Sequence, residues 1–298
     1  MVSAQVITSA KQASSYYTHE YYEDQGNPGS WYGEGAKALG LTGAITRDEF
    51  MQIMRGEDPN TGEQLVKSGG ILHEHRPGTD LTFSAPKAVS ILGMSDERVL
   101  DAWNESVSKA LEYIQEDYSW YRSTRDGVTS KVQSDNMVIA RFNHITSRNN
   151  DPQVHTHCII TNMTQTPDGW RALENERLLQ DRKLFDIIVK NEMVRELWKL
   201  GYNAEYINRD IHIEGVSLAV KDALSTRTEQ LNEAAKALRG EYPSAPEWQI
   251  KQMACLGTRE AKEHLEMSDL KAAWDKKLEA LGTSLTEIYY RCMDAGEK

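Results

Sequence analysis

Two neighbouring segments with the composition of β-strands constrain the fold of this chain more than any other feature. Residues 136–145 and 154–163 are rich in valine, isoleucine, threonine and phenylalanine, and apolar and polar residues partly alternate along them. The linker between them, residues 146–153, is short and polar and includes Asn149, Asn150, Asp151 and Pro152. This pattern predicts two adjacent antiparallel strands.

The rest of the chain mixes helical and extended patterns, which indicates an α+β fold. Residues 171 onward are mainly helical in pattern, with the clearest helix at 183–200 and three more within 221–280. We expect these last helices to form a thumb-like clasp. The other expected elements are a strand at 4–8, a helix at 9–20, an irregular Gly/Pro-containing stretch at 26–43, a strand at 81–92 entering an Ala-Pro-Lys turn, a helix at 96–118 and a β segment at 205–214.

Length and composition favour one soluble catalytic unit. A chain of 298 residues can build one large core, and we expect a catalytic core at 1–220 and a helical clasp of the same domain at 221–298. Hydrophobic and charged contents of 39% and 27% argue against disorder. No run approaches the ~18 apolar residues of a membrane span, and residues 1–11 lack a basic start followed by an apolar run. We therefore expect a cytoplasmic protein without membrane insertion.

Three histidines could bind a metal ion. His155 and His157 stand at positions i and i+2 of a predicted strand, so their side chains project from one face about 6.6 Å apart. His144 lies near the end of the neighbouring predicted strand. Three imidazoles would leave coordination positions open, as a catalytic metal requires, whereas the alternative is hydrogen-bonded core histidines.

Tyrosines and one acid are candidates for catalysis. A phenol becomes a competent nucleophile beside a base or a metal-bound phosphate. Asp80, at the start of a predicted strand, could accept a proton from a tyrosine or orient a histidine ligand, although acids at strand entries are also common turn residues. The tyrosines form two adjacent pairs that could equally be packing aromatics: Tyr16, Tyr17, Tyr21 and Tyr22.

The net charge of −11 is unusual for a protein that binds nucleic acid. Charge is unevenly distributed, however, because residues 122–148 contain five cations against Asp126 and Asp135. A local basic face is therefore possible, and we expect binding to be sensitive to salt. Three cysteines without a CxxC pair indicate neither a disulfide framework nor a thiolate zinc site.

Several ordered blocks of the sequence resemble the conjugative relaxases of the TraI/TrwC type, a branch of the histidine-hydrophobe-histidine endonucleases. The central ones are Arg76-Pro-Gly-Thr-Asp80-Leu-Thr-Phe-Ser-Ala-Pro-Lys87, Phe142-Asn-His144 and Pro152-Gln-Val-His155-Thr-His157. The likeness also includes Trp31-Tyr-Gly-Glu-Gly-Ala and Thr226-Arg-Thr-Glu-Gln and so covers most of the chain. Thr156, between the two histidines, is less apolar than the class name implies.

The resemblance implies a central antiparallel sheet flanked by helices, with a C-terminal helical region that closes over single-stranded DNA. It implies that His144, His155 and His157 bind a divalent metal ion, that Tyr16 is the nucleophile and that Asp80 assists it. The expected reaction is nicking and rejoining at a plasmid origin of transfer through a 5′-phosphotyrosyl intermediate. Tyr21 could make a second cut, and Tyr17 and Tyr22 belong to the same tyrosine set.

The resemblance also implies partners and a wider context. We expect single-stranded DNA at the origin of transfer, relaxosome accessory proteins and a coupling protein, in the cytoplasm of a bacterial donor cell. Mg²⁺ or Mn²⁺ is the expected ion, although imidazole ligands also suit Zn²⁺, Co²⁺ or Ni²⁺. The sequence contains no GxxxxGK[ST] loop, so we expect an N-terminal fragment of a longer relaxase-helicase. Arg76, Lys87 and Arg148 are candidate DNA contacts, with solvated surface charge as the alternative.

Three other functions remain open at this level. A rolling-circle replication initiator would share the chemistry. A non-catalytic single-stranded DNA-binding module would need the histidines only to hold the sheet together. A metal oxygenase with two histidines and a carboxylate would give the tyrosines no role.

Overall fold

The computed structural model describes residues 1–17, 29–66, 75–258 and 265–297. The chain divides into two compact units, each built from separate stretches of sequence. The first comprises Met1–Ala85, Asp101–His144 and His155–Glu196, and the second Pro86–Leu100, Ile145–Val154 and Leu197–Lys298. The expected division into a core at 1–220 and a clasp at 221–298 remains a prediction.

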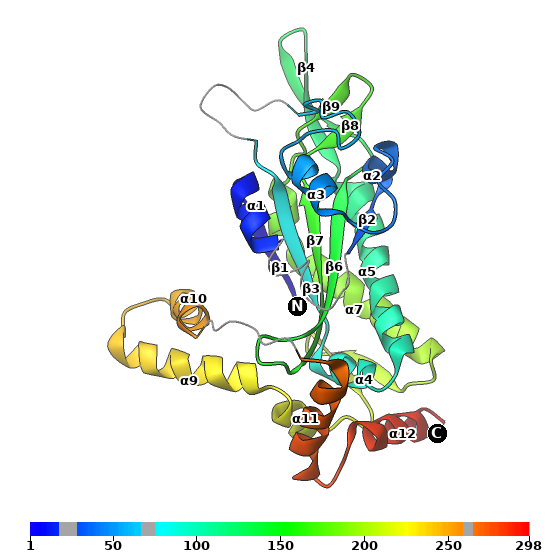
Figure 1. The fold of residues 1–298 in the computed structure, drawn as a ribbon, viewed down its shortest axis with the longest axis vertical. Coiled ribbons are helices and arrows are strands. Elements are labelled where there is room, and N and C mark those ends of the chain that lie inside the picture. The colour runs from blue at the N-terminus through cyan, green and yellow to red at the C-terminus, as the bar shows by residue number, and fades with distance from the viewer. Residues whose placement is uncertain (18–28, 67–74, 259–264, 298) are drawn as a thin grey trace. The chain divides into compact units, whose positions relative to one another are not determined.

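A five-stranded sheet in the order β1-β3-β7-β6-β2 forms the centre of the first unit (Figure 1). β1 pairs with β3, β3 with β7 and β2 with β6, each time in the antiparallel sense. The two strands predicted to be adjacent, β6 and β7, are neighbours in the middle of the sheet, which confirms the main sequence prediction. The strands are β1 (Val2–Ile7), β2 (Ser30–Tyr32), β3 (Gly78–Ser84), β6 (Ile139–Thr146) and β7 (Pro152–Thr161).

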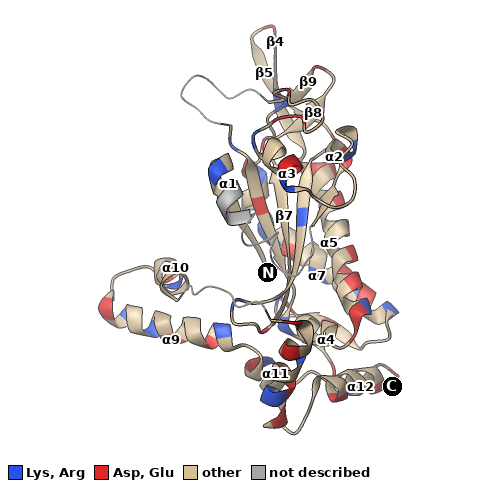
Figure 2. Cartoon of the chain, viewed as in Figure 1, with Lys and Arg blue, Asp and Glu red and all other residues tan. Residues whose placement is uncertain are grey.

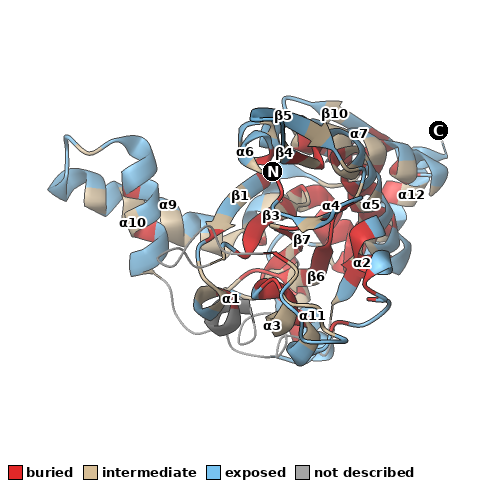
Figure 3. Ribbon diagram, turned by 90° about the horizontal axis from the view of Figure 1, so that it is seen from above, coloured by how far each residue is buried: buried red, intermediate tan, exposed pale blue. Residues whose placement is uncertain are grey.

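Helices cover both faces of this sheet, as the view in Figure 3 shows. On one face, α1 (Ala10–Tyr17) and α3 (Arg47–Met54) pack on a core that includes Ala13, Phe50 and Phe142. On the other face, α5 (Glu97–Tyr118) and α7 (Arg182–Lys199) cover the sheet. The indole nitrogen of Trp103 on α5 donates to Thr156 of β7 at 3.2 Å. Each strand of the sheet centre is therefore buried on both sides.

Several elements differ from their sequence predictions. The stretch 26–43 is not wholly irregular, because it contains β2 and α2 (Glu34–Ala38), and the strand expected at 81–92 ends at Ser84 and gives way to α4 (Lys87–Gly93). β2 was missed because Trp31 and Tyr32 are held in a strand by pairing with β6, and the local sequence pattern does not reveal that pairing. Two hairpins and the short helix α6 (Glu176–Gln180) were not predicted from the sequence. The hairpins pair β4 (Trp120–Arg125) with β5 (Val128–Gln133), and β8 (Thr164–Thr166) with β9 (Gly169–Arg171).

The second unit contains the C-terminal helices and the turn between β6 and β7. The predicted helices within 221–280 are confirmed as α9 (Thr226–Glu241), α10 (Glu247–Gly257) and α11 (Met267–Glu279). Asp151 in the turn is 1% exposed and accepts hydrogen bonds from Thr226 at 2.7 Å and from Lys277 at 2.9 Å. These hydrogen bonds hold the turn against α9 and α11. The remaining elements are β10 (Ala204–Ile207), β11 (Asp210–Ile213), α8 (Leu218–Ala223) and α12 (Leu285–Gly296).

Within the described ranges, none of the helices combines the length and the apolar character that crossing a bilayer requires.

Charged side chains are concentrated on particular elements (Figure 2). The exposed side of α5 is strongly acidic and accounts for a large share of the net charge of −11. Its exposed acids are Glu97, Asp101, Glu105, Glu112, Glu116 and Asp117.

Candidate metal centre

The three histidines singled out in the sequence converge on one face of the sheet. Their ring centroids form a nearly equilateral triangle, with 5.0 Å between His144 and His155, 5.5 Å between His144 and His157, and 5.3 Å between His155 and His157. One nitrogen of each ring lies within 4.8 Å of the others. These three side chains could hold a single metal ion.

The sheet produces this convergence by simple alternation. His155 and His157 lie two residues apart on β7 and therefore face the same side, while His144 reaches that side from the adjacent strand β6. Thr156 between them points to the opposite face, where it is 0% exposed and donates to Asn143 at 2.8 Å. The less apolar residue at this position is thus accommodated by hydrogen bonds.

Asp80 positions one of the histidines from the neighbouring strand β3. It is 3% exposed, and its Oδ2 lies 2.9 Å from Nδ1 of His157. Asp80 pairs with Ile159 across the strands and reaches His157 along the diagonal. A proton on Nδ1 that is donated to this carboxylate leaves Nε2 as the ligand nitrogen, as is usual for metal-bound histidines. Of the two roles considered for Asp80, the geometry favours that of orienting a ligand.

Thr82 is a further contributor that the sequence reading missed. Its hydroxyl lies 3.0 Å from Nδ1 of His157 and 3.3 Å from Oδ1 of Asp80. Asp80 and Thr82 are two residues apart on β3, so the same alternation that identified the histidine pair could have indicated this residue. Together the two side chains fix the rotation of the His157 ring.

The tyrosines are only partly described. Tyr16 and Tyr17 form the last turn of α1, and their side chains lie outside the described part of the chain. Tyr21 and Tyr22 also lie outside the described residues. Because Ala13 of α1 belongs to the core on the histidine face, this helix packs on the same side of the sheet as the three imidazoles.

The predicted DNA contacts have different surroundings. Arg76 is exposed just before β3 in the first unit. In the second unit, the ammonium of Lys87 donates to the carbonyls of Pro152 at 2.9 Å and Leu224 at 2.8 Å, and burial lowers its pKa. Arg148 in the same unit is half-buried. Of these three cations, Arg76 is therefore the most accessible to a ligand.

Comparison with known proteins identifies close relatives. The family model described as TrwC relaxase matches residues 10–281. The multifunctional conjugation protein TraI of Escherichia coli is 35% identical over 295 residues, and TraI of strain K12 is 33% identical. Each alignment covers 95% of this chain, and the chain spans only 16% of the length of each TraI protein.

Solved structures with the same fold include relaxases in complex with DNA. Conjugative relaxase TrwC with oriT DNA matches in a metal-bound form with a TM-score of 0.85 and in a copper-bound form with a TM-score of 0.84. Both are 32% identical and cover 96% of this chain and 100% of the TrwC chain. The α+β fold with a central antiparallel sheet is confirmed by this match. The chain belongs to the TrwC relaxase family.

Proposed function

We propose that this chain cuts one strand of DNA at a plasmid origin of transfer and becomes joined to it through Tyr16. The observation that carries the proposal is the convergence of His144, His155 and His157 on the sheet face where α1, the helix of Tyr16, also packs. Family membership supports the same reaction, since the TraI relatives are conjugation proteins and the TrwC structures contain oriT DNA. The proposal therefore assigns metal binding to the three histidines and nucleophilic attack to Tyr16.

The histidine cluster fits a divalent metal ion. The three side chains each offer one imidazole nitrogen, and Asp80 orients the ring of His157. Bound there, a divalent ion would act as a Lewis acid toward the phosphoryl oxygens of the scissile phosphate. We infer Mg²⁺ or Mn²⁺ in the cell, with Zn²⁺, Co²⁺ and Ni²⁺ also able to occupy an all-imidazole site.

The proposed step exchanges one phosphodiester for another. The phenol oxygen of Tyr16 forms a bond to phosphorus, and the bond from phosphorus to the 3′ oxygen breaks. The phenol proton passes to a nearby base, and the departing 3′ oxygen takes up a proton to become a hydroxyl. Because a high-energy ester is retained, attack by a 3′ hydroxyl reverses the reaction. We assign a second cut to Tyr21, and Tyr17 and Tyr22 remain secondary candidates.

We further propose the wider context that the family implies. Single-stranded DNA at the origin of transfer is the substrate, and Arg76, Arg148 and Lys87 are candidate contacts for it, with Arg76 the most exposed. Accessory proteins of the relaxosome and a coupling protein would act with the chain in the cytoplasm of the donor cell. The helices from α9 onward would clasp the strand, as part of a longer relaxase-helicase.

A denaturing gel tests this proposal. The chain is incubated with a labelled single-stranded oligonucleotide that carries its plasmid's transfer origin, with and without Mn²⁺ or Mg²⁺. We expect a slowly migrating protein-DNA adduct that requires the ion and that Tyr16→Phe abolishes, while Tyr290→Phe, at an exposed tyrosine outside the candidate set, serves as the matched control and retains it. Cleavage without any adduct would point to a hydrolytic nuclease and reject the proposal. A bound but uncut strand would indicate a binding module.

A further inference from the structure

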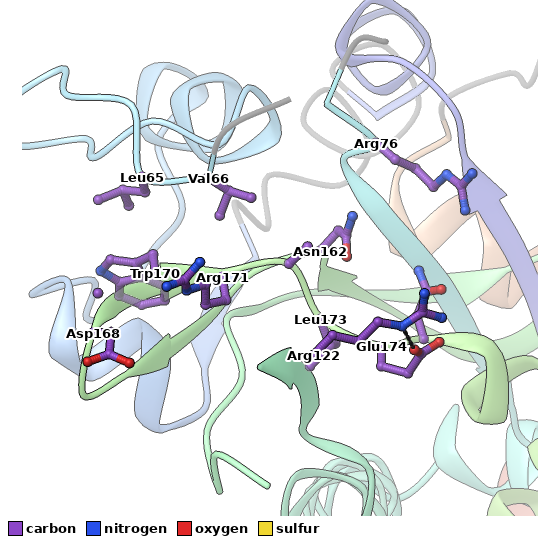
Figure 4. Close-up of a pocket in the computed structure, with 13 residues that line it drawn as sticks. Leu65, Val66, Arg76, Arg122, Asn162, Asp168, Trp170, Arg171, Leu173 and Glu174 are labelled. Carbon is purple, nitrogen blue, oxygen red and sulfur yellow. Dashed lines mark hydrogen bonds and ion pairs between the residues drawn. The ribbon is translucent and has the colours of Figure 1, made fainter. Parts of the chain in front are cut away.

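A pocket of about 750 Å³ opens in the first unit beyond the end of β7, separate from the histidine cluster (Figure 4). Its walls come from the β8–β9 hairpin and the segment after it, from Arg122 on β4, and from residues on either side of 67–74. None of the three histidines lines it. The pocket is therefore a distinct feature that the proposed cleavage reaction leaves unexplained.

One side of the pocket offers an aromatic surface. Trp170 of β9 is half-buried, and together with Leu65 it packs against the hydrophobic core of this unit. Figure 4 shows Leu65 and Val66 above the indole, with Arg171 beside it. Because the core holds the ring in place, its orientation is fixed before any ligand arrives. Stacking on a preformed aromatic face is a sequence-tolerant way to bind a nucleobase.

Positive charge surrounds this aromatic surface. Arg76, Arg122 and Arg171 line the pocket and are exposed. Two acids are also present. One of them, Glu174, accepts a hydrogen bond from Nε of Arg122 at 2.7 Å. This bond uses Nε and leaves the outer guanidinium nitrogens of Arg122 for another partner. The other, Asp168, lies 4.0 Å from Arg125. The cations thus outnumber the acids in a protein whose net charge is −11. Such a local excess suits the phosphates of a nucleic acid.

The side-chain oxygen of Asn162 adds a buried hydrogen-bond acceptor to the pocket wall. It follows β7 directly, and its backbone N–H donates to Pro77 at 2.8 Å, which anchors it at the pocket wall. Its side-chain Oδ1 is buried, and within the described residues it accepts no hydrogen bond. A buried acceptor without a donor is unfavourable, so a ligand that supplies an N–H would be favoured.

We propose that this pocket holds one nucleotide of the single-stranded DNA substrate. Its base stacks on Trp170, and the phosphates on either side of it lie beside the three arginines. This inference rests on the proposed function. Oδ1 of Asn162 accepts a hydrogen bond from the exocyclic amino group of the base, which adenine, cytosine and guanine carry and thymine lacks. The pocket therefore discriminates against thymine at one position of the substrate.

The position of that nucleotide relative to the cut can be bounded. Asn162 lies five residues beyond His157 along β7, which corresponds to about 16 Å at ~3.3 Å per residue. At ~3.4 Å per nucleotide of a stacked strand, this span is about five nucleotides, and fewer if the strand is stretched. The selected nucleotide should lie within about five positions of the scissile phosphate.

An abasic scan combined with a double-mutant cycle tests the inference. Each of the roughly six nucleotides on either side of the cut is replaced in turn by an abasic residue, and Kd is measured with Tyr16→Phe protein so that no cleavage intervenes. At one position the abasic change and Trp170→Ala should each weaken binding about ten-fold, and the two together should weaken it no further than one alone. Thymine at that position should lose affinity with wild-type Asn162 but not with Asn162→Ala.

Controls separate the possible failures. Trp170→Phe keeps an aromatic face and should recover most of the affinity, whereas Arg195→Ala, on an exposed part of α7, should change nothing. If the wild-type chain forms its adduct but no position couples to Trp170, the pocket inference is wrong while the proposed function stands. If the wild-type chain forms no adduct at all, the proposed function itself fails.

Discussion

At the scale of single residues, the ring of His157 shows how the metal centre is prepared. Asp80 and Thr82 both contact its Nδ1, at 2.9 Å and 3.0 Å, from a strand that carries no metal ligand. The spacing of His155 and His157, together with the predicted pairing of the two strands, predicted the convergence of the three histidines, because the period of a strand fixes which side chains share a face. Asp80 was predicted either to orient a histidine ligand or to accept a proton from a tyrosine. Which histidine it contacts was not predictable, since Asp80 reaches His157 diagonally and the contact depends on the register between β3 and β7.

Replacing Asp80 with asparagine should weaken metal binding by about 10- to 100-fold. The change removes the carboxylate that receives the Nδ1 proton of His157, and partners of this kind typically contribute that much to affinity. Isothermal titration with Mn²⁺ or Zn²⁺ measures it. Asp168→Asn, at a side chain 61% exposed, is the matched control and should leave the affinity unchanged. Equal affinities for Asp80→Asn and wild type would show that the carboxylate does not orient the ligand.

Thr82→Val should have a smaller effect of the same kind. The valine keeps the shape of the side chain and leaves the carboxylate of Asp80 in place, so the losses are the hydroxyl contact to His157 and the hydrogen bond that the hydroxyl donates to Oδ1 of Asp80. The contact to the ring acts on the metal site directly, and we expect metal affinity to fall by a few-fold, in keeping with the ~0.5 to 1.5 kcal/mol of one hydrogen bond. The same titration decides the matter, and a loss as large as that of Asp80→Asn would argue that Thr82 is the main partner of the ring.

At the scale of elements, local sequence signals determined some segments and not others. The long helix α5 was predicted from its apolar spacing, and the structure confirms it. The β4–β5 hairpin was missed although Asp126 and Gly127 carry its signal, with positive φ values of 52° and 77° that match a two-residue turn. For β2 the local signal is weak, because a three-residue strand between Gly29 and Gly33 depends on its pairing with β6.

The start of α5 gives a prediction about stability. Asp96, 7% exposed, accepts hydrogen bonds from the backbone N–H of Arg98 at 3.1 Å and from the hydroxyl of Tyr202 at 2.5 Å. Burial opposes its ionisation, but the hydrogen bonds from Arg98 and Tyr202 outweigh burial and lower the pKa of Asp96. Tyr202→Phe should therefore reduce the free energy of unfolding by about 2 kcal/mol at neutral pH.

Urea denaturation measures this loss, with Tyr290→Phe, at a side chain 61% exposed, as the control. Since the folded-state pKa of Asp96 is lowered, its contribution is complete above the ordinary aspartate pKa of ~3.9 and disappears as pH falls through the lowered value. The difference between wild type and Tyr202→Phe should accordingly shrink only in strong acid. A difference that is constant down to that range and below would contradict the assigned hydrogen bond to the carboxylate.

At the scale of the whole molecule, a net charge of −11 has to be reconciled with a DNA substrate. The acids gather on elements such as α5, whereas three arginines gather at the pocket in the first unit. The sequence indicated a local basic face near 122–148 but could not assemble the pocket, because its arginines come from three separate segments. Only the tertiary structure brings Arg76, Arg122 and Arg171 together.

The affinity for single-stranded DNA should therefore fall as salt concentration rises, with a slope set by a small number of phosphate contacts. Three phosphate contacts would give a slope of about −2 for the logarithm of the association constant against that of salt concentration, at ~0.7 per contact. Fluorescence anisotropy between roughly 50 and 200 mM salt measures this slope. Arg171→Ala should reduce its magnitude by about 0.7, and Arg195→Ala should not. A slope near zero would exclude phosphate contacts as a source of affinity.

Strand rejoining distinguishes the proposed exchange of phosphodiesters through a tyrosine from simple hydrolysis. The purified protein-DNA adduct is mixed with an oligonucleotide that ends in a free 3′ hydroxyl, in the presence of Mn²⁺ and without any nucleotide cofactor. We expect the protein to be released and a longer, continuous DNA strand to appear. Release of the protein with a free 5′ phosphate and no joined strand would contradict it, because that product is the result of hydrolysis.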